Sequence, residues 1–116
     1  MIELYGIPNC DTVKKAQKWL RAKEIEFQFH DFKKEGAPLS QLKEWASQTS
    51  WETLLNRKGT TWRQLDEATK TSISTQTAAL KLMEKFPSLI KRPVVFRKGK
   101  FLVNGFEEAV FEKLFF

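Results

Sequence analysis

The N-terminal part of the chain changes its hydrophobic periodicity twice, and these changes limit the folds that it can adopt. Apolar and polar residues alternate in MIELY, and they alternate again in IEFQF at residues 25–29. Between them, from Asp11 to about Lys23, apolar residues recur at helical spacing: Val13, Ala16, Leu20 and, alongside, Trp19. Alternation is typical of strands, and the longer period is typical of amphipathic helices. The sequence therefore predicts a β-α-β unit with parallel strands.

The remaining sequence predicts helices first and a hairpin afterwards. Helical patterns occupy residues 36–48, 50–56, 60–70 and 75–86, with Ser50 and either Thr60 or Thr61 as expected N-caps. The segment PVVFRKGKFLV predicts a hairpin that turns at Lys98-Gly99, and residues 104–116 predict a final amphipathic helix. The predicted fold class is α/β, a thioredoxin-like fold (β-α-β, helical insert, β-β-α) with a four-stranded mixed sheet. We expect one domain over 1–116, with the insert at about 37–86.

Composition excludes several classes of protein. The chain has 116 residues, which suits one domain with a core of its own, and no apolar run is long enough to span a membrane. His30 is the only histidine and Cys10 the only cysteine, so we expect no metal site. The N-terminus lacks the pattern of a signal peptide, and a single cysteine suits a reducing compartment, so we expect a cytoplasmic protein.

The net charge of +6 comes from basic residues that are scattered among acidic ones. Such a pattern is more typical of a solvated surface than of a nucleic-acid footprint, so we expect no nucleic acid as a partner. The tryptophans at 45, 51 and 62 are interpreted as core of the insert, because the sequence shows no basic groove among them. We also expect a monomer that binds no membrane.

Cys10 stands at the junction of the first predicted strand and the first predicted helix. Free N–H groups and the helix dipole at that point favour a thiolate and lower the pKa of a thiol. The alternative is a buried cysteine that acts only as a small hydrophobic residue, but the polar turn PNCD fits this alternative poorly. Cys10 is the candidate nucleophile, and the candidate anion-binding residues around it are Asn9, Thr12, Lys14 and Lys15.

Arg92 and Pro93 precede the strand of the predicted hairpin. Proline at this point either simply starts the strand or forms a cis peptide bond, since X–Pro is the common site of cis bonds. Arg92 is a further candidate for anion binding, because a guanidinium makes paired hydrogen bonds to oxyanions.

Four stretches of the sequence resemble one family in the same order along nearly the whole chain: CDTVKKA, WETLLNRKGTTWRQLDE, IKRPVV and NGF. They resemble the arsenate reductase-like (ArsC) family, and the YffB branch of that family in particular. The resemblance implies a thioredoxin-like fold with a helical insert. It also implies that Cys10 is the nucleophile and that Pro93 is a cis-proline beside it. We expect no bound cofactor, with glutathione as a co-substrate.

Arsenate reductases of this family surround the cysteine with three arginines, and this chain keeps only part of that set. Arg92 matches one of them, while Asn56 stands at the second position and Arg57 is displaced by one residue. The third position is Asn104, and Gly6 replaces a histidine that precedes the reductase cysteine. Arsenate reduction is therefore expected to be weak.

The resemblance leaves three functions open. The first is a glutathione-dependent thiol reductase with a single nucleophilic cysteine, for which Arg92 and Arg57 bind the substrate and glutaredoxin is a further partner. The second is an arsenate reductase coupled to glutathione and glutaredoxin. The third is an RNA polymerase-binding regulator of the Spx type, although Val13 stands where Spx proteins carry their second cysteine.

Overall fold

The structure is a computed structural model that describes residues 1–116, and it divides into two compact units. The sheet unit comprises Met1–Glu35 and Arg92–Phe116, and the insert unit comprises Gly36–Lys91. The elements of the sheet unit are β1 (Ile2–Gly6), α1 (Asp11–Ala22), β2 (Phe27–Asp31), α2 (Phe32–Glu35), β3 (Val94–Arg97), β4 (Lys100–Asn104) and α8 (Glu108–Phe115). Those of the insert unit are α3 (Leu39–Gln48), α4 (Trp51–Leu54), α5 (Thr60–Arg63), α6 (Glu67–Ser72), α7 (Gln76–Lys85) and the 3₁₀ turn η1 (Pro87–Leu89).

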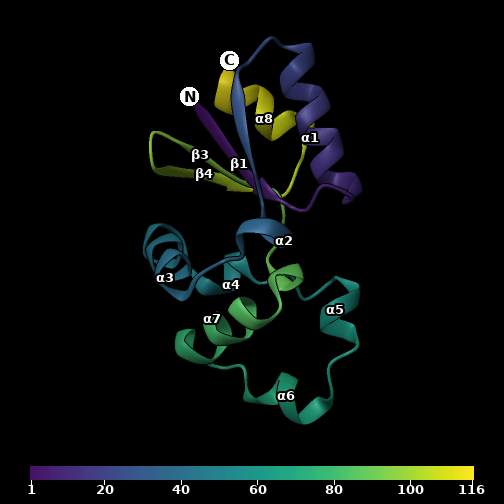
Figure 1. Cartoon of the computed structure of the whole chain (residues 1–116), viewed down its shortest axis with the longest axis vertical. Coiled ribbons are helices and arrows are strands. Elements are labelled where there is room, and N and C mark those ends of the chain that lie inside the picture. Colours follow the sequence, from purple (N-terminus) through teal and green to yellow (C-terminus); the bar gives the residue numbers. More distant parts are fainter. The chain divides into compact units, whose positions relative to one another are not determined.

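The sheet has four strands in the order β2-β1-β3-β4 (Figure 1). β1 pairs parallel with β2 and antiparallel with β3, and β3 pairs antiparallel with β4. The predicted mixed sheet and the thioredoxin-like order of elements are thus confirmed. The β3–β4 hairpin turns at Lys98 and Gly99, whose φ angles of 50° and 78° suit a tight turn between twisted strands.

The second strand begins two residues later than the alternation in IEFQF predicts. The end of α1 explains the difference, because Glu24 adopts a left-handed conformation with φ 57°. The Ile25 N–H then donates to the Leu20 carbonyl at 2.9 Å, which closes the helix and leaves Ile25 outside the strand. Helix α2 and the turn η1 were not predicted, since both are too short to show a periodic pattern.

One hydrophobic core joins the sheet of this unit to its two long helices. The strands contribute Ile2, Leu4 and Val95, and the helices pack against them through residues that include Leu20 of α1 and Phe111 of α8. Figure 1 shows both helices beside the sheet. The core therefore fixes the start of α1, where Cys10 lies, against the centre of the sheet.

The insert unit is built from short helices, and three of them (α4, α6 and α7) begin at side-chain caps. Ser50, Asp66 and Thr75 each accept a hydrogen bond from a backbone N–H in the first turn of the helix that follows. The predicted helix over 60–70 is in fact two helices, because the Asp66 cap starts a new one. Gly59 is the N-cap of α5, so the expectation of a Thr60 or Thr61 cap was wrong. No helix of the chain is both long and apolar enough to cross a membrane.

Candidate functional site

Cys10 is the N-cap residue of α1, and its backbone is held on both sides. Its N–H donates to the Ile7 carbonyl at 3.2 Å, and its carbonyl accepts the Lys14 N–H at 2.9 Å. The backbone of Cys10 is extended, with φ −92° and ψ 125°, so that the chain turns directly from the loop into the helix. The thiol is free and half-buried. A reagent can therefore reach a thiol whose position is fixed by the helix start.

The surroundings of Cys10 favour the thiolate. Burial alone raises the pKa of the thiol, but the Val13 N–H donates a hydrogen bond that lowers it. Arg92 lowers the pKa further through a side-chain hydrogen bond and through its charge, and the Thr12 N–H adds to this effect. The result is a pKa of Cys10 below its ordinary value. Two N–H groups of the first helical turn and one guanidinium thus stabilise the negative sulfur.

Arg92 reaches the thiol from a position two residues before β3. The Arg92–Pro93 peptide bond is cis, and the Pro93 carbonyl accepts the Gly105 N–H at 2.9 Å. This hydrogen bond ties the approach to β3 to the loop that follows β4. The sequence placed Arg92 among several candidate cations, and the structure brings this one into contact with the sulfur.

The other residues predicted around Cys10 differ in their relation to the thiol. Thr12 contacts the sulfur through its backbone N–H. Asn9, Lys14 and Lys15 are exposed, and the structure records no contact between their side chains and the sulfur. Val13 was not among the predicted site residues, although its backbone N–H donates to the sulfur. Residue type alone does not show which backbone N–H groups contact a side chain.

Gly6 and Val13 pack closely beneath the start of α1. A Cβ atom placed on Gly6 would lie 2.7 Å from Cγ2 of Val13, which is closer than carbon atoms approach without a shift. Val13 itself is completely buried. Residue 6 therefore has no room for a larger side chain unless Val13 shifts, and Val13 belongs to the core.

Arg57 lies in the insert unit, in the turn between α4 and α5. Its guanidinium carbon is 5.7 Å from the ring centroid of Trp51 and 5.7 Å from that of Trp62. Trp45 is core, as predicted, with 4% of its surface exposed. Trp51 and Trp62 are half-buried and turn their rings to Arg57, so the interpretation of all three tryptophans as core was wrong for these two.

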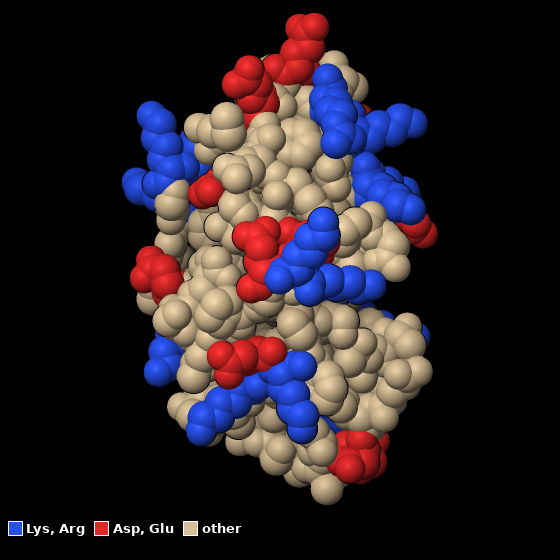
Figure 2. Space-filling view, viewed as in Figure 1, with Lys and Arg blue, Asp and Glu red and all other residues tan.

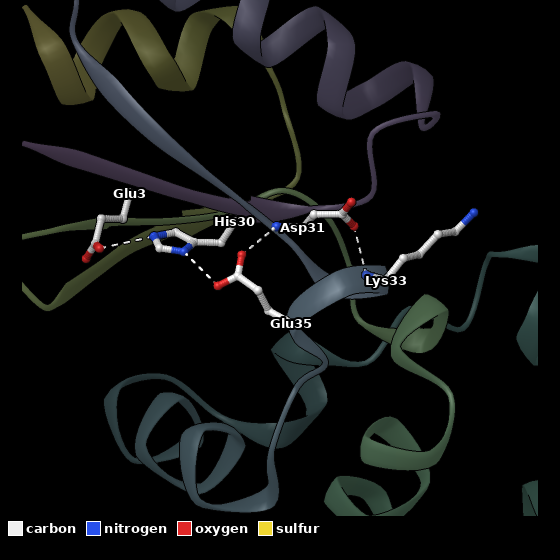
Figure 3. A network of polar contacts seen from close by, with 5 residues as sticks. All are labelled: Glu3, His30, Asp31, Lys33 and Glu35. Atoms are coloured by element: carbon white, nitrogen blue, oxygen red, sulfur yellow. Dashed lines mark hydrogen bonds and ion pairs between the residues drawn. The ribbon is translucent and has the colours of Figure 1, made fainter.

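His30 connects the end of β2 to β1 and α2, as Figure 3 shows. Its Nε2 lies 3.2 Å from a Glu3 oxygen and its Nδ1 lies 3.3 Å from a Glu35 oxygen. Carboxylates only accept hydrogen bonds, so both contacts are satisfied when both ring nitrogens carry protons. The ring also stacks on Tyr5 at 4.3 Å. Burial raises the pKa of Tyr5, and the charges of Glu3 and Glu35 raise it further.

This network has a structural role at the end of β2. Glu35 also accepts the Asp31 N–H at 3.1 Å, and Asp31 in turn accepts the Lys33 N–H at 2.8 Å (Figure 3). These bonds hold α2 against the strand that precedes it. Sequence reasoning gave His30 no catalytic role and did not detect its two carboxylate partners, which come from separate elements.

The charged side chains form no continuous basic surface on the face that Figure 2 shows. Lys and Arg lie there in separate groups, most of them next to Asp or Glu. The chain also has no group of three or more His, Cys, Asp or Glu side chains arranged to hold a metal ion. The half-buried thiol with its arginine remains the best-formed reactive group of the molecule.

Comparisons with known proteins agree with the fold. The model of the ArsC family matches residues 5–114. This chain belongs to the ArsC family. A solved YFFB protein is 42% identical over 97% of each chain, with a TM-score of 0.88. An arsenate reductase (ArsC) related protein from Brucella melitensis is 45% identical, with a TM-score of 0.80, over 98% of this chain and 93% of that one.

The family also contains regulators. The global transcriptional regulator Spx 1 of Lactococcus lactis is 27% identical over 110 residues, which is 93% of this chain and 84% of the regulator. The ArsC family therefore unites proteins related to arsenate reductases with transcriptional regulators on one thioredoxin-like fold. Membership gives the fold, and the residues at the site must decide between the functions.

Proposed function

We propose that this protein is a glutathione-dependent thiol reductase in which Cys10 is the single nucleophile. The observation that carries the proposal is the half-buried thiol, whose pKa is lowered by two backbone N–H groups and by Arg92. Such a thiol is accessible, and it ionises more readily than an ordinary cysteine. The chain has no second cysteine, so an adduct on Cys10 requires a thiol from outside to release it.

The reaction consists of two thiol–disulfide exchanges. The Cys10 thiolate attacks the glutathione sulfur of a mixed disulfide, forms a Cys10–glutathione disulfide, and releases the other sulfur as a thiolate that takes up a proton. The thiolate of a second glutathione then attacks the glutathione sulfur of this adduct. Oxidised glutathione leaves and the Cys10 thiolate returns. One glutathione thiol is oxidised in the second exchange, and the mixed disulfide of the substrate is reduced to a thiol. The other half of the oxidised glutathione comes from the substrate.

Glutathione suits the charges of the site. It carries two carboxylates and one ammonium group, so its net charge near neutral pH is negative. Arg92 beside the sulfur attracts and orients such a molecule, and Arg57 is proposed as a second anion-binding side chain. Weaker contributions to binding are proposed for residues at the exposed start of α1: Asn9, Thr12, Lys14 and Lys15.

Glutaredoxin is proposed as an alternative thiol donor for the second exchange. The protein is proposed to act as a monomer.

Arsenate reduction is the weaker candidate for this site. Of the three arginines that the resemblance assigns to arsenate reductases, Arg92 has a direct match, while Asn56 and Asn104 stand at the other two positions. Each lost charge-assisted hydrogen bond costs about 1.5–3 kcal/mol. We expect little or no turnover of arsenate with glutathione and glutaredoxin supplied, and robust turnover would contradict this assignment of the anion site.

Binding to RNA polymerase is the second candidate, because it is supported by the similarity to Spx 1 over most of the chain. The redox switch of Spx proteins has no counterpart here, since Val13 is buried at the position of the second cysteine. Any polymerase binding would therefore be independent of redox state. A pull-down with polymerase separates the two functions, because the Cys10→Ala variant would retain such binding while losing all reductase activity.

Mass spectrometry of the protein incubated with oxidised glutathione tests the main proposal. We expect one glutathione on Cys10, removed by added reduced glutathione, with Cys10→Ser as the control that gains none. The absence of an adduct across a range of pH and glutathione concentration would refute the proposed function.

A further inference from the structure

The turn that carries Arg57 is held on both sides. The Asn56 N–H donates to the Leu89 carbonyl at 2.7 Å, and Leu55 forms an isolated antiparallel bridge with Ile90. The Asn56 side chain accepts the Lys58 N–H at 3.1 Å and packs so close to Gly59 that a Cβ there would lie 2.8 Å from its amide nitrogen. Although Arg57 is exposed in a short loop, its backbone is therefore fixed by its neighbours.

The side chain of Arg57 is restricted as well. Its guanidinium carbon lies over the rings of Trp51 and Trp62, which belong to α4 and α5. We name these three residues the arginine–tryptophan cluster. Contacts of this kind attract a cation to the ring face and limit the rotamers that the arginine samples. A position in a loop favours a mobile side chain, but the structure gives Arg57 two aromatic neighbours.

The hydrogen-bond donors of Arg57 are not used inside the chain. A guanidinium has five N–H donors that point outward in its plane, while contacts with aromatic rings do not consume them. The structure records no hydrogen bond and no ion pair for this side chain. A guanidinium that is held in place with open donors is well suited to bind a carboxylate through two parallel hydrogen bonds, and restricting it beforehand reduces the entropy lost on binding.

We propose that Trp51 and Trp62 are positioning residues that hold Arg57 ready to bind a carboxylate of glutathione. The inference rests on the proposed glutathione function for the identity of the ligand, and on the insert unit alone for the geometry. It assigns no contact with the sulfur to either tryptophan. Their effect passes through Arg57.

The first test measures how fast the Cys10 adduct forms as the concentration of oxidised glutathione is varied. We expect Trp51→Leu and Trp62→Leu to raise the concentration for half-maximal rate by about threefold, with the limiting rate unchanged. Reaction of Cys10 with neutral iodoacetamide should stay as in the wild type. Trp62→Phe, which keeps an aromatic ring, should restore most of the loss, and Arg63→Ala on α5 is the matched control for a lost positive charge.

A double-mutant cycle separates positioning from a merely structural role. If the tryptophans act through Arg57, Trp62→Leu has no further effect in an Arg57→Ala background. An equal loss in both backgrounds, or an equal loss with iodoacetamide, would overturn the inference, and so would an Arg57→Ala variant that behaves as the wild type. Thermal unfolding of every variant identifies any that fails to fold, and Trp51→Leu then serves in place of Trp62→Leu.

The second test does not depend on adduct formation. In the Cys10→Ser variant, the Arg57 Nε–H resonance is followed by NMR during titration with oxidised glutathione. We expect a saturating shift that weakens in Trp62→Leu. If this shift occurs while the wild type forms no adduct, the arginine–tryptophan cluster binds glutathione and the proposed reductase function fails. If the adduct forms and the shift is absent, the reductase proposal stands and the inference is overturned.

Discussion

The sheet unit and the insert unit fix an arginine in different ways. Arg92 in the sheet unit contacts an ionisable partner, the Cys10 thiol, and lies two residues before a strand of the central sheet. Arg57 in the insert unit is held by aromatic rings, in a turn between two helices of four residues each. The first arrangement changes the chemistry of a neighbour, and the second leaves the arginine open to a ligand. The two arginines thus differ in their contacts: one stabilises a negative sulfur, and the other lies over aromatic rings.

We also expect the sheet unit to have a more rigid core than the insert unit. The variant with the largest expected loss of stability tests this difference. Phe111 is completely buried and packs edge-on against Trp19 at 5.4 Å and Phe106 at 4.7 Å. Phe111→Ala should lower the free energy of unfolding by about 3–5 kcal/mol, because it leaves a cavity among side chains that cannot close around it. Urea denaturation measures the loss.

Leu80→Ala in α7 is the counterpart in the insert unit, where the side chain is equally buried. We expect a smaller loss from it, since short helices can shift to fill part of the space. A larger loss for Leu80→Ala than for Phe111→Ala would contradict the view that the sheet unit holds the more rigid core.

The next effect concerns the close packing beneath the thiol. Gly6→Ala should reduce the free energy of unfolding by about 1–3 kcal/mol, because the added methyl group overlaps Val13. In a Val13→Ala background the same change should cost much less, because the smaller residue makes room. Denaturation of the two single variants and the double variant measures the coupling, and additive losses would show that Val13 is not the obstacle.

The third prediction addresses Arg92 directly. Arg92→Ala should slow formation of the glutathione adduct on Cys10 about tenfold or more, equivalent to ~1.4 kcal/mol in the barrier. It should also move the inflection of the iodoacetamide rate to higher pH, since removing the guanidinium raises the pKa of Cys10 toward its ordinary value. Lys98→Ala, in the hairpin turn, is the control that keeps the wild-type rate. Unchanged rate and inflection in Arg92→Ala would remove Arg92 from the site.

The smallest effect is local to the insert unit. The Thr75 hydroxyl accepts the Ala78 N–H at 3.2 Å and starts α7. Thr75→Ala should cost about 1 kcal/mol of stability, which is typical of a lost N-cap, and Thr75→Ser should restore it. Thermal unfolding measures both variants, and the adduct rate of Cys10 should not change in either.

The sheet unit was predictable because its signals are local and periodic. Alternation marked β1 and the hairpin, and the apolar stripe of α1 followed from residues three and four apart. The start of β2 was missed because Glu24 adopts a conformation that residue type does not predict. Cys10 could be proposed from its place before a helix, whereas the donation by the Val13 N–H requires coordinates.

The insert unit was harder to predict, for a physical reason. Helices of four to ten residues carry few periods, so caps set their bounds more than hydrophobic patterns do. The arginine–tryptophan cluster joins residues from two such helices and the loop between them. Composition alone could not distinguish Trp51 and Trp62 from the buried Trp45. The three side chains differ in orientation, which only the structure shows.

The position of the insert in the chain has a consequence for how the protein folds. β1 pairs with β2 nearby in sequence, and β3 pairs with β4 across a tight turn, but β1 must also pair with β3 from the far side of the insert. Contacts between distant residues form late, because the intervening chain must first be brought together. Once the helices of the insert have formed, they shorten the flexible segment to be closed. The entropy cost of closing a loop grows only logarithmically with its length. The long insert between β2 and β3 should therefore affect the rate at which the sheet is completed more than its stability.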